Sequence, residues 1–175
     1  MSYYDIIESP LGPVFIGGSD AGVHRLDFID PDLDRDRVTR IAALEAESGE
    51  SPVQDASALA AVSAQLREYF GGGRTDFDLM LAARGTEFQR RVWRALLDVR
   101  YGETASYGDI AAAVGKPTAS RAVGAANGCN PISVIVPCHR IVGSKGGLTG
   151  YGGGIERKKW LLNLEAQALR PASVV

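Results

Sequence analysis

Residues 132–142 limit the possible structure and function of this chain more than any other segment. They join an apolar run to two reactive side chains, a cysteine and a histidine. Residues 134–136 read Val-Ile-Val, a run long enough for a buried strand. Because proline cannot donate a hydrogen bond to a sheet, Pro137 predicts the end of that strand. Cys138 would then stand at the rigid end of a buried element with His139 beside it. Since a nearby base makes the reactive thiolate available at neutral pH, the segment predicts a nucleophile.

The alternative is that Cys138 is structural, because a free cysteine is often only a small buried apolar residue. Two neighbouring features favour the functional interpretation. His139 and Arg140 are polar groups that are costly to bury without a purpose. Seven glycines lie within residues 143–154, and a backbone this rich in glycine can lie close to another molecule.

Length and composition limit the class of protein. The chain has 175 residues, of which 45% are hydrophobic and 23% charged, which suits one or two small globular domains with a core. It contains no apolar run long enough to span a membrane, and its first residues lack the basic region of a secretory signal. The two cysteines would close only a short loop, which favours a reducing, cytoplasmic setting. Two histidines are too few to favour a Cys/His zinc site.

The charges divide unequally between the two halves of the chain. Residues 1–83 hold 6 basic and 15 acidic side chains, a net charge of −9. Residues 84–175 hold 13 basic and 6 acidic side chains, a net charge of +7. This division predicts two modules, with a polyanion as the partner of the second. A salt-bridged surface between the halves would explain the charges equally well.

The first module is predicted to be a small mixed sheet with a helix. Alternating apolar residues indicate strands, and apolar residues at helical spacing indicate the helix. In chain order we expect strands at 3–8, 14–18 and 23–29, a loop with at most one loose helix at 30–51, a helix at 52–70 and a strand at 77–81. We interpret His24 as a hydrogen-bonded strand residue and expect no chemistry in this module.

The second module is predicted to be helical. Capping patterns at Thr86 and Ser106 indicate the first residues of two helices, and Thr118 is placed to cap a third. The expected helices cover residues 86–99, 106–115, 119–126 and 156–168. Two short helices with a Gly/Pro turn between them at 115–117 are typical of a helix-turn-helix, although an ordinary helical hairpin has the same pattern.

Five separated motifs in this module closely resemble the O6-alkylguanine-DNA alkyltransferases, also called methylated-DNA–protein-cysteine methyltransferases. The motifs include residues 121–125, 130–131, 137–140 and 150–154. The resemblance covers most of 84–168, whereas 1–83 match only loosely. It implies an α+β fold with a small mixed α/β scaffold domain at 1–83. It also implies a mostly helical domain at 84–175 with a winged helix-turn-helix that binds duplex DNA in the minor groove and extrudes the damaged nucleotide.

The same resemblance implies roles for individual residues. Cys138 would accept the alkyl group, His139 would take its proton through a water, and Glu165 would hold His139 in the required tautomer. Asn130 would brace the turn that joins the recognition helix to the active-site strand. Contacts with DNA are expected from Arg121, which would enter the base stack, and from Tyr107, Ser106, Ala122 and Ala126. The substrate pocket is expected to comprise Tyr107, Tyr151, Gly152, Gly153 and Ile141.

The expected activity is direct repair of DNA. The alkyl group of O6-alkylguanine in double-stranded DNA would pass irreversibly to Cys138, once per chain and without a cofactor. We expect a monomer, with O4-alkylthymine as a substrate and cooperative assembly along DNA left open. Two departures from the family are present. Cys129 is an unexpected residue type before Asn130, and the N-terminal half lacks the cysteines that hold zinc in some members, so no metal is expected.

Three other functions compete with this interpretation. A cysteine hydrolase could use Cys138, but its base usually lies far along the chain instead of next to the nucleophile. A non-catalytic relative that binds alkylated bases would lack the acceptor cysteine. A plain helix-turn-helix regulator would leave residues 134–140 unexplained. Methyl transfer to the protein from an O6-methylguanine oligonucleotide would distinguish the transferase from all three.

Overall fold

The computed structural model describes residues 1–30, 32 and 34–170, which form two compact units. The first unit comprises Met1–Arg90 and the short segment Pro131–Ile135. The second comprises Arg91–Asn130 and the chain from Val136 onward. The division into 1–83 and 84–175 stays a prediction, and the return of Pro131–Ile135 to the first unit is a feature that the sequence did not indicate.

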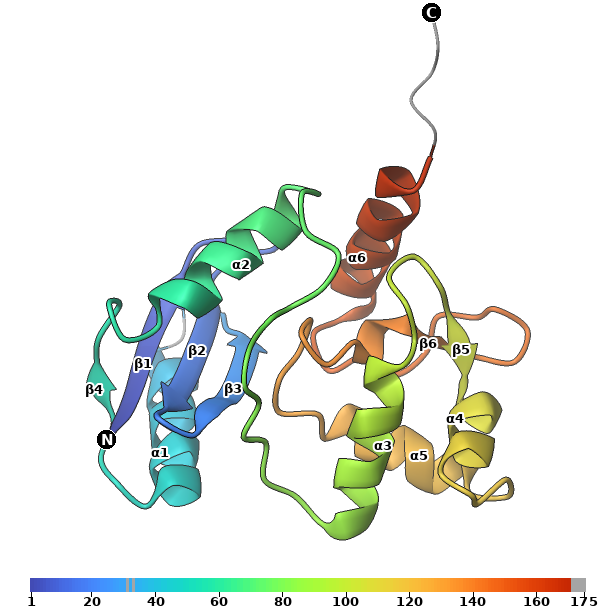
Figure 1. Ribbon diagram of the computed structural model, residues 1–175, viewed down its shortest axis with the longest axis horizontal. Coiled ribbons are helices and arrows are strands. Elements are labelled where there is room, and N and C mark those ends of the chain that lie inside the picture. The colour runs from blue at the N-terminus through green and yellow to red at the C-terminus, as the bar shows by residue number, and fades with distance from the viewer. Residues whose placement is uncertain (31, 33, 171–175) are drawn as a thin grey trace, which may run out of the picture. The chain divides into compact units, whose positions relative to one another are not determined.

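The first unit is built on a four-stranded sheet with the order β3-β2-β1-β4 (Figure 1). Its strands are β1 (Ser2–Ile7), β2 (Val14–Ser19), β3 (Gly22–Phe28) and β4 (Val53–Gln54). The first three form antiparallel hairpins, and β4 pairs in parallel with β1. Gly22 opens β3 at φ +124°, and a Cβ there would lie 2.4 Å from the carbonyl oxygen of Met80. Only glycine suits both the backbone conformation and this close approach.

Two helices, α1 (Asp34–Ser48) and α2 (Ala60–Phe70), cover opposite faces of this sheet. A Cβ built on Gly17 of β2 would meet Leu44 of α1, whereas one on the adjacent Gly18 would meet Leu59 at the start of α2. Because successive strand residues face opposite sides, β2 is buried on both faces. Phe15 of β2 packs with Leu44 and Ile29 in a core cluster on the α1 side.

Three expectations for this unit were wrong. The segment 34–48 is a regular 15-residue helix instead of a loop with at most one loose helix, and its buried Leu44 and partly buried Ile41 pack in the core cluster. The following helix begins at residue 60, since β4 and a turn occupy the residues before it. Residues 77–81 form no extended strand and make only an isolated bridge between Leu81 and Val23.

The apolar run 134–136 is buried but is not a strand. Ile132 makes one bridge with Leu26, whose backbone bonds to the carbonyl of Pro131 and the amide of Ser133. The chain then turns, with Val134 at φ +71°, a value that a β-branched residue rarely adopts. The predicted strand was therefore wrong, because its apolar character reflects burial in a turn.

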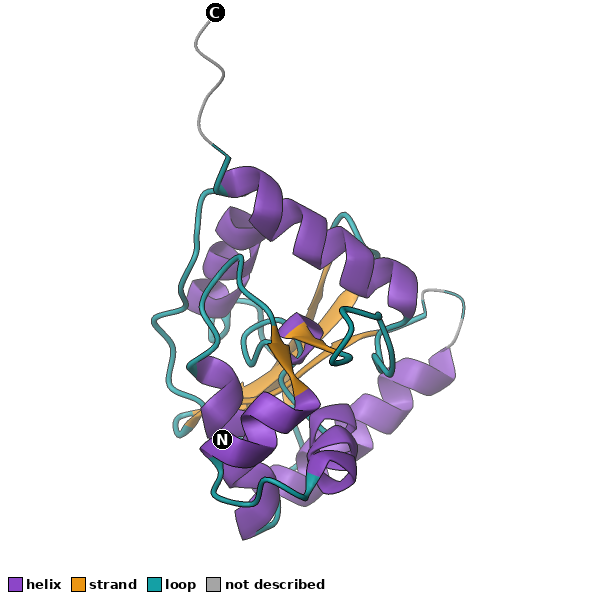
Figure 2. Ribbon diagram, turned by 90° about the vertical axis from the view of Figure 1, so that its right-hand side faces the viewer, coloured by secondary structure: helices purple, strands orange, loops and turns teal. Residues whose placement is uncertain are grey.

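The second unit carries four α-helices in the part of the chain that the structure describes: α3 (Glu87–Leu97), which begins in the first unit, α4 (Tyr107–Ala113), α5 (Ser120–Gly128) and α6 (Ile155–Ala168). Figure 2 colours the helices, strands and loops of the chain by type. The short strands β5 (Ala105–Ser106) and β6 (Ile141–Val142) pair in parallel, and a 3-10 turn, η1 (Cys138–Arg140), precedes β6. The small sheet domain and the helical second unit confirm the α+β class.

Local capping explains where two of these helices begin. Thr86 and Gln89 exchange side-chain and backbone hydrogen bonds before α3, and Ser106 and Asp109 do the same at α4. Thr118 does not cap α5, because the N-cap position is Ala119 and no side-chain bond is made there. The short α4 and α5 pack together as the predicted helix pair. Within the described residues, no helix is both long enough and apolar enough to cross a membrane.

Candidate active site

The turn η1 places Cys138 at the centre of the candidate site. Its amide donates to the carbonyl of Val136 at 2.8 Å, which tightens the chain directly after Pro137. Cys138 is 4% exposed, and His139 and Arg140 are buried with it. Cys138 therefore lies in a buried 3-10 turn instead of at the end of a buried strand, where the sequence had placed it.

His139 is held by a carboxylate from α6. Its Nε2 lies 2.8 Å from Oε1 of Glu165, and both side chains are completely buried. Leu161 lies one turn earlier on the same buried face of α6, which directs Glu165 inward. Burial lowers the pKa of His139, an effect that the hydrogen bond and negative charge of Glu165 oppose. A neutral imidazole that donates from Nε2 to a carboxylate carries its lone pair on Nδ1.

Two further donors converge on Glu165. The guanidinium of Arg140 donates from Nε to Oε2 and from Nη2 to Oε1, both at 3.0 Å. The amide of Gly102 donates to Oε2 at 3.2 Å. Arg140 was not among the predicted site residues, because the sequence does not reveal that the turn directs it to the same carboxylate as His139.

The thiol of Cys138 is protonated in the resting protein. Burial raises its pKa to about 11, opposed by a hydrogen bond from Asn130 and by the positive charge of Lys158. Asn130 also donates to the carbonyl of Val136 at 2.8 Å, which braces the turn before the cysteine. The thiolate is therefore not available at neutral pH without a proton acceptor.

Lys158 is a buried cation that the sequence analysis did not identify. Its ammonium group donates to the carbonyl of Ile141 and, at 3.1 Å, to that of Thr149. Burial lowers the pKa of Lys158, and Cys138 acts in the opposite direction. A signal was present, because Lys158, Leu161 and Glu165 share one face of α6 at spacings of three and four.

The other predicted pocket residues differ in their contacts and in how deeply they are buried. Tyr107, the first residue of α4, donates from its hydroxyl to the carbonyl of Thr149 at 3.2 Å. Tyr151 is buried, Gly153 is half-buried and Gly152 is exposed. Ile141 is completely buried, so it contributes to the site through the carbonyl that Lys158 binds.

The predicted DNA-contacting residues differ in exposure. Arg121 and Ala122 are exposed in the first turn of α5, and Ser106 is half-buried at the N-cap of α4. Ala126 is only 2% exposed, and its carbonyl accepts a hydrogen bond from Trp93 Nε1 at 2.8 Å. Ala126 is therefore buried in the structure without DNA, and its contact with DNA stays a prediction.

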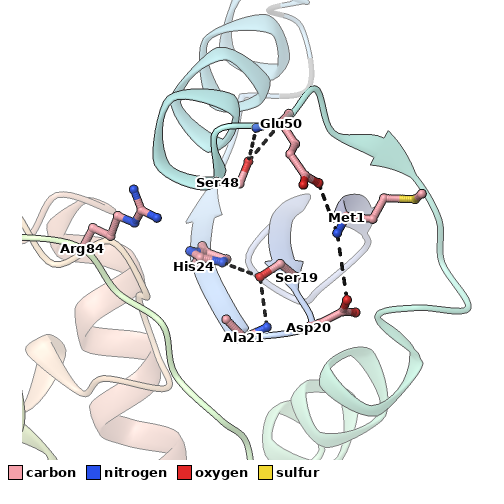
Figure 3. A pocket seen from close by; sticks show the side chains of 8 residues that line it. All are labelled: Met1, Ser19, Asp20, Ala21, His24, Ser48, Glu50 and Arg84. Atoms are coloured by element: carbon pink, nitrogen blue, oxygen red, sulfur yellow. Dashed lines mark hydrogen bonds and ion pairs between the residues drawn. The ribbon is translucent and has the colours of Figure 1, made fainter.

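The first unit contains a separate pocket of about 200 Å³ (Figure 3). His24 lines it and makes a 2.8 Å hydrogen bond to Ser19, in agreement with its interpretation as a bonded strand residue. The ammonium group of Met1 lies 3.1 Å from Glu50 and 3.9 Å from Asp20, so these charges already compensate one another. In the described parts of the chain, no three His, Cys, Asp or Glu residues are grouped so that they could hold a metal ion.

Comparison with known proteins supplies an independent line of evidence. Residues 2–83 match the family model "6-O-methylguanine DNA methyltransferase, ribonuclease-like domain", and residues 87–167 match its "DNA binding domain". A methylated-DNA–protein-cysteine methyltransferase of Methanosarcina barkeri is 45% identical over 168 residues, 96% of this chain and 99% of the relative. A protein of the same name from Mycobacterium tuberculosis is 46% identical over 165 residues, 94% of this chain and 93% of the relative.

Solved structures agree with these matches. The crystal structure of M. tuberculosis O6-methylguanine methyltransferase has a TM-score of 0.82 and 45% identity, covering 99% of this chain and 97% of its own. The M. tuberculosis OGT in complex with DNA has a TM-score of 0.81 and 44% identity, covering 95% and 94%.

Proposed function

Because this chain belongs to the 6-O-methylguanine DNA methyltransferase family, we propose that it repairs DNA by moving an alkyl group from guanine O6 to its own Cys138. The observation that carries the assignment of the residue is the buried sequence Cys138–His139 with Glu165 at 2.8 Å from the imidazole. A nucleophile, a base and an orienting carboxylate form the set that nucleophilic catalysis requires.

The transfer is a displacement at the alkyl carbon. The sulfur of Cys138 forms a bond to that carbon as the bond from carbon to O6 breaks, and the electron pair of the broken bond stays on the guanine. The proton of the thiol passes through a water to Nδ1 of His139, whose other nitrogen is held by Glu165. The leaving guanine takes up one proton from water and the protonated His139 returns one proton to water, so the products are a thioether and an unmodified base.

Tyr107 assists the departure of the base. Its hydroxyl donates to the carbonyl of Thr149 in the free protein, so this hydrogen must turn toward the substrate when the base enters. A hydrogen bond to the guanine as negative charge develops on it lowers the barrier to transfer. Tyr151 and the backbone of Gly152 and Gly153 form the wall of the pocket that admits the flat purine.

Double-stranded DNA that contains O6-alkylguanine is the proposed partner. The O6 atom lies inside a duplex, so the nucleotide must leave the stack before Cys138 can reach it. Unstacking costs a few kcal/mol, part of which an inserted side chain offsets. Arg121, exposed in the first turn of the short α5, is the side chain proposed for this insertion.

The protein acts once per chain, as a monomer and without a cofactor. A thioether is a poor leaving group, and the groups around Cys138 provide no second nucleophile to displace the alkyl group from it. The two cysteines are not joined in a disulfide. A compartment that keeps thiols reduced, such as the cytoplasm, suits a reaction that consumes a free thiol.

Intact mass spectrometry tests this function. The protein is mixed with a duplex oligonucleotide that contains one O6-methylguanine, and the expected result is one methyl group per chain and restored guanine. Cys138→Ala should abolish the mass gain and keep DNA binding. Cys129→Ala is the matched control and should gain the methyl group normally, because Cys129 is exposed and lies outside the buried cluster. Repeated turnover, or methylation that persists in Cys138→Ala, would contradict the proposal.

A further inference from the structure

The guanidinium of Arg140 takes no part in the proposed transfer, although it lies beside the groups that perform it. Its fork makes two 3.0 Å hydrogen bonds to the two oxygens of Glu165. Its third nitrogen, Nη1, donates to the carbonyl of Val99 at 2.7 Å. Its central carbon lies 5.7 Å from the ring centre of Tyr101. The guanidinium is thus fixed on three sides and is matched in geometry to one carboxylate.

The contact between Arg140 and Glu165 matters because it balances a buried negative charge. Glu165 is 0% exposed, and a buried carboxylate is costly unless a positive charge compensates it. Gly102 and His139 give Glu165 hydrogen bonds but no full charge while the imidazole is neutral. Arg140 supplies a compensating positive charge in direct contact with both oxygens of Glu165.

We propose that Arg140 is a positioning residue that keeps Glu165 ionised, so that His139 donates from Nε2 and presents Nδ1 as the proton acceptor. This inference rests on the proposed function of His139, and it adds a residue that determines which imidazole nitrogen is basic. An ionised carboxylate can only accept a hydrogen bond, whereas a protonated one can also donate. The ionisation of Glu165 therefore selects the tautomer of its neighbour.

Removal of the guanidinium would reverse this selection. In Arg140→Met, burial favours the neutral carboxylic acid of Glu165. The acid would donate its hydrogen to Nε2 of His139, and the ring hydrogen would move to Nδ1. His139 would then have no lone pair on the nitrogen that is proposed to receive the thiol proton. Raising the pH should ionise Glu165 again and restore the original tautomer.

Other charged or titratable groups lie near Arg140, Glu165 and His139. Charges in this group also shift one another's pKa values. Lys158 from α6 and Arg140 from η1 both lower the pKa of His139 by their positive charge, secondary to burial. The pKa of Tyr101 is raised, first by burial and then by the charge of Glu165. Cys138 is a neutral thiol at neutral pH because burial raises its pKa to about 11. Lys158, Tyr101 and Cys138 are present in both proteins, so a titration that appears only in Arg140→Met is assigned to Glu165 and His139.

The first measurement is nitrogen NMR of the imidazole rings, which reports the tautomer without any activity assay. The chain has two histidines, and His24→Gln identifies the signals of His139. We expect the Nε2–H tautomer in the wild-type protein at pH 7 and the Nδ1–H tautomer in Arg140→Met. The Nε2–H form should return in that variant as the pH is raised.

The second measurement is the pH profile of single-turnover methyl transfer. Arg140→Met should slow transfer at pH 7 by roughly 100-fold, within the range that acid–base groups contribute, and should recover part of the rate at alkaline pH. Arg140→Lys keeps the charge and loses the fork, so it should keep the Nε2–H tautomer and a profile of wild-type shape. Arg94→Met, which removes an exposed arginine of α3, is the matched control and should match the wild-type profile.

A double variant separates this role from simple support of the fold. Adding Arg140→Met to Glu165→Gln should cause little further loss of rate, because the carboxylate through which Arg140 acts is already gone. A folded Arg140→Met with the Nε2–H tautomer and a rate profile of wild-type shape would overturn the inference. If Arg140→Met does not fold, a reversed tautomer in Arg140→Lys would overturn it. Failure of methyl transfer in the wild-type protein would refute the proposed function instead, while the NMR result would still decide the tautomer.

Discussion

At the scale of single residues, the site combines a protonated nucleophile with a neutral base. Burial raises the pKa of Cys138 to about 11 and lowers that of His139, so neither group carries charge at neutral pH. This resting state protects the thiol from other electrophiles, because the thiolate is the reactive form. In the proposed mechanism it also makes proton transfer to His139 part of the reaction, which begins when substrate binding brings the alkyl carbon to the thiol.

A small alkylating probe should distinguish the two cysteines. Because Cys129 is exposed and Cys138 is buried, iodoacetamide should modify Cys129 first at pH 7. The rate at Cys138 should rise about tenfold per pH unit until the pH approaches the raised pKa of its thiol, since the thiolate fraction grows in that proportion. Peptide mapping by mass spectrometry measures each site, with Cys138→Ser as the control. A rate at Cys138 that levels off near neutral pH would contradict this expectation.

Glu165→Gln should damage both the chemistry and the stability of the fold. The amide leaves Arg140 as a buried charge without its counterion, which typically costs about 3–5 kcal/mol of the free energy of unfolding. It also removes the tautomer-setting carboxylate, so methyl transfer should slow and the apparent pKa of Cys138 in transfer should rise. DNA affinity should change little, because Glu165 is completely buried. Urea unfolding and rate-against-pH profiles measure the two effects, and identical profiles for variant and wild type would remove Glu165 from the mechanism.

At the scale of elements, the pair α4 and α5 carries residues of both the proposed DNA-contacting surface and the proposed pocket. Tyr107 begins α4 and reaches Thr149 in the loop after β6, while Trp93 of α3 fixes the far end of α5 through Ala126. The exposed first turn of α5 carries Arg121. In the proposed mechanism, Arg121 of α5 serves recognition and Tyr107 of α4 serves the chemistry, so a substitution should be able to separate the two.

Arg121→Ala should lower repair in duplex DNA steeply and spare transfer from a free alkylated base. Arg121 acts at the base stack in the proposed mechanism, so its loss affects extrusion of the nucleotide and leaves the thiol unchanged. Single-turnover rates with an O6-methylguanine duplex and with free O6-benzylguanine measure the two steps. Arg94→Ala on α3 is the control with the same change in charge. Equal losses on both substrates would place Arg121 in the fold or at the thiol.

The starts of two helices could be predicted from the sequence, because they depend on residues close together in the chain. The capping boxes at Thr86 and Ser106 lie within four residues of the chain, and both form as expected. The turn at residues 133–135 was not predictable, because the positive φ of Val134 is imposed by contacts distant in sequence. Arg140 was missed for the same reason, since its role depends on a carboxylate 25 positions away.

At the scale of the whole molecule, the unequal charges predict how the protein meets DNA. The half from residue 84 has a net charge of +7 within a chain whose total is −2. The first half contributes acidic groups that repel a polyanion, so association must use the basic half. Two of the thirteen basic side chains there, Lys158 and Arg140, are buried and so do not face solvent. Only a few of the remaining basic side chains can face one groove of the DNA duplex at a time.

The affinity for duplex DNA should therefore fall with salt, but along a shallow slope. Each neutralised phosphate contributes about 0.9 to the slope of log affinity against log salt. Arg121→Gln should reduce that slope if its guanidinium lies among the phosphates and bases. Arg35→Gln, an exposed arginine on α1 of the first unit, is the matched control and should leave the slope unchanged. Fluorescence anisotropy over a salt series with an unmodified duplex provides the measurement. A salt-independent affinity, or an equal change in the Arg35 variant, would show that the basic half is only a solvated surface.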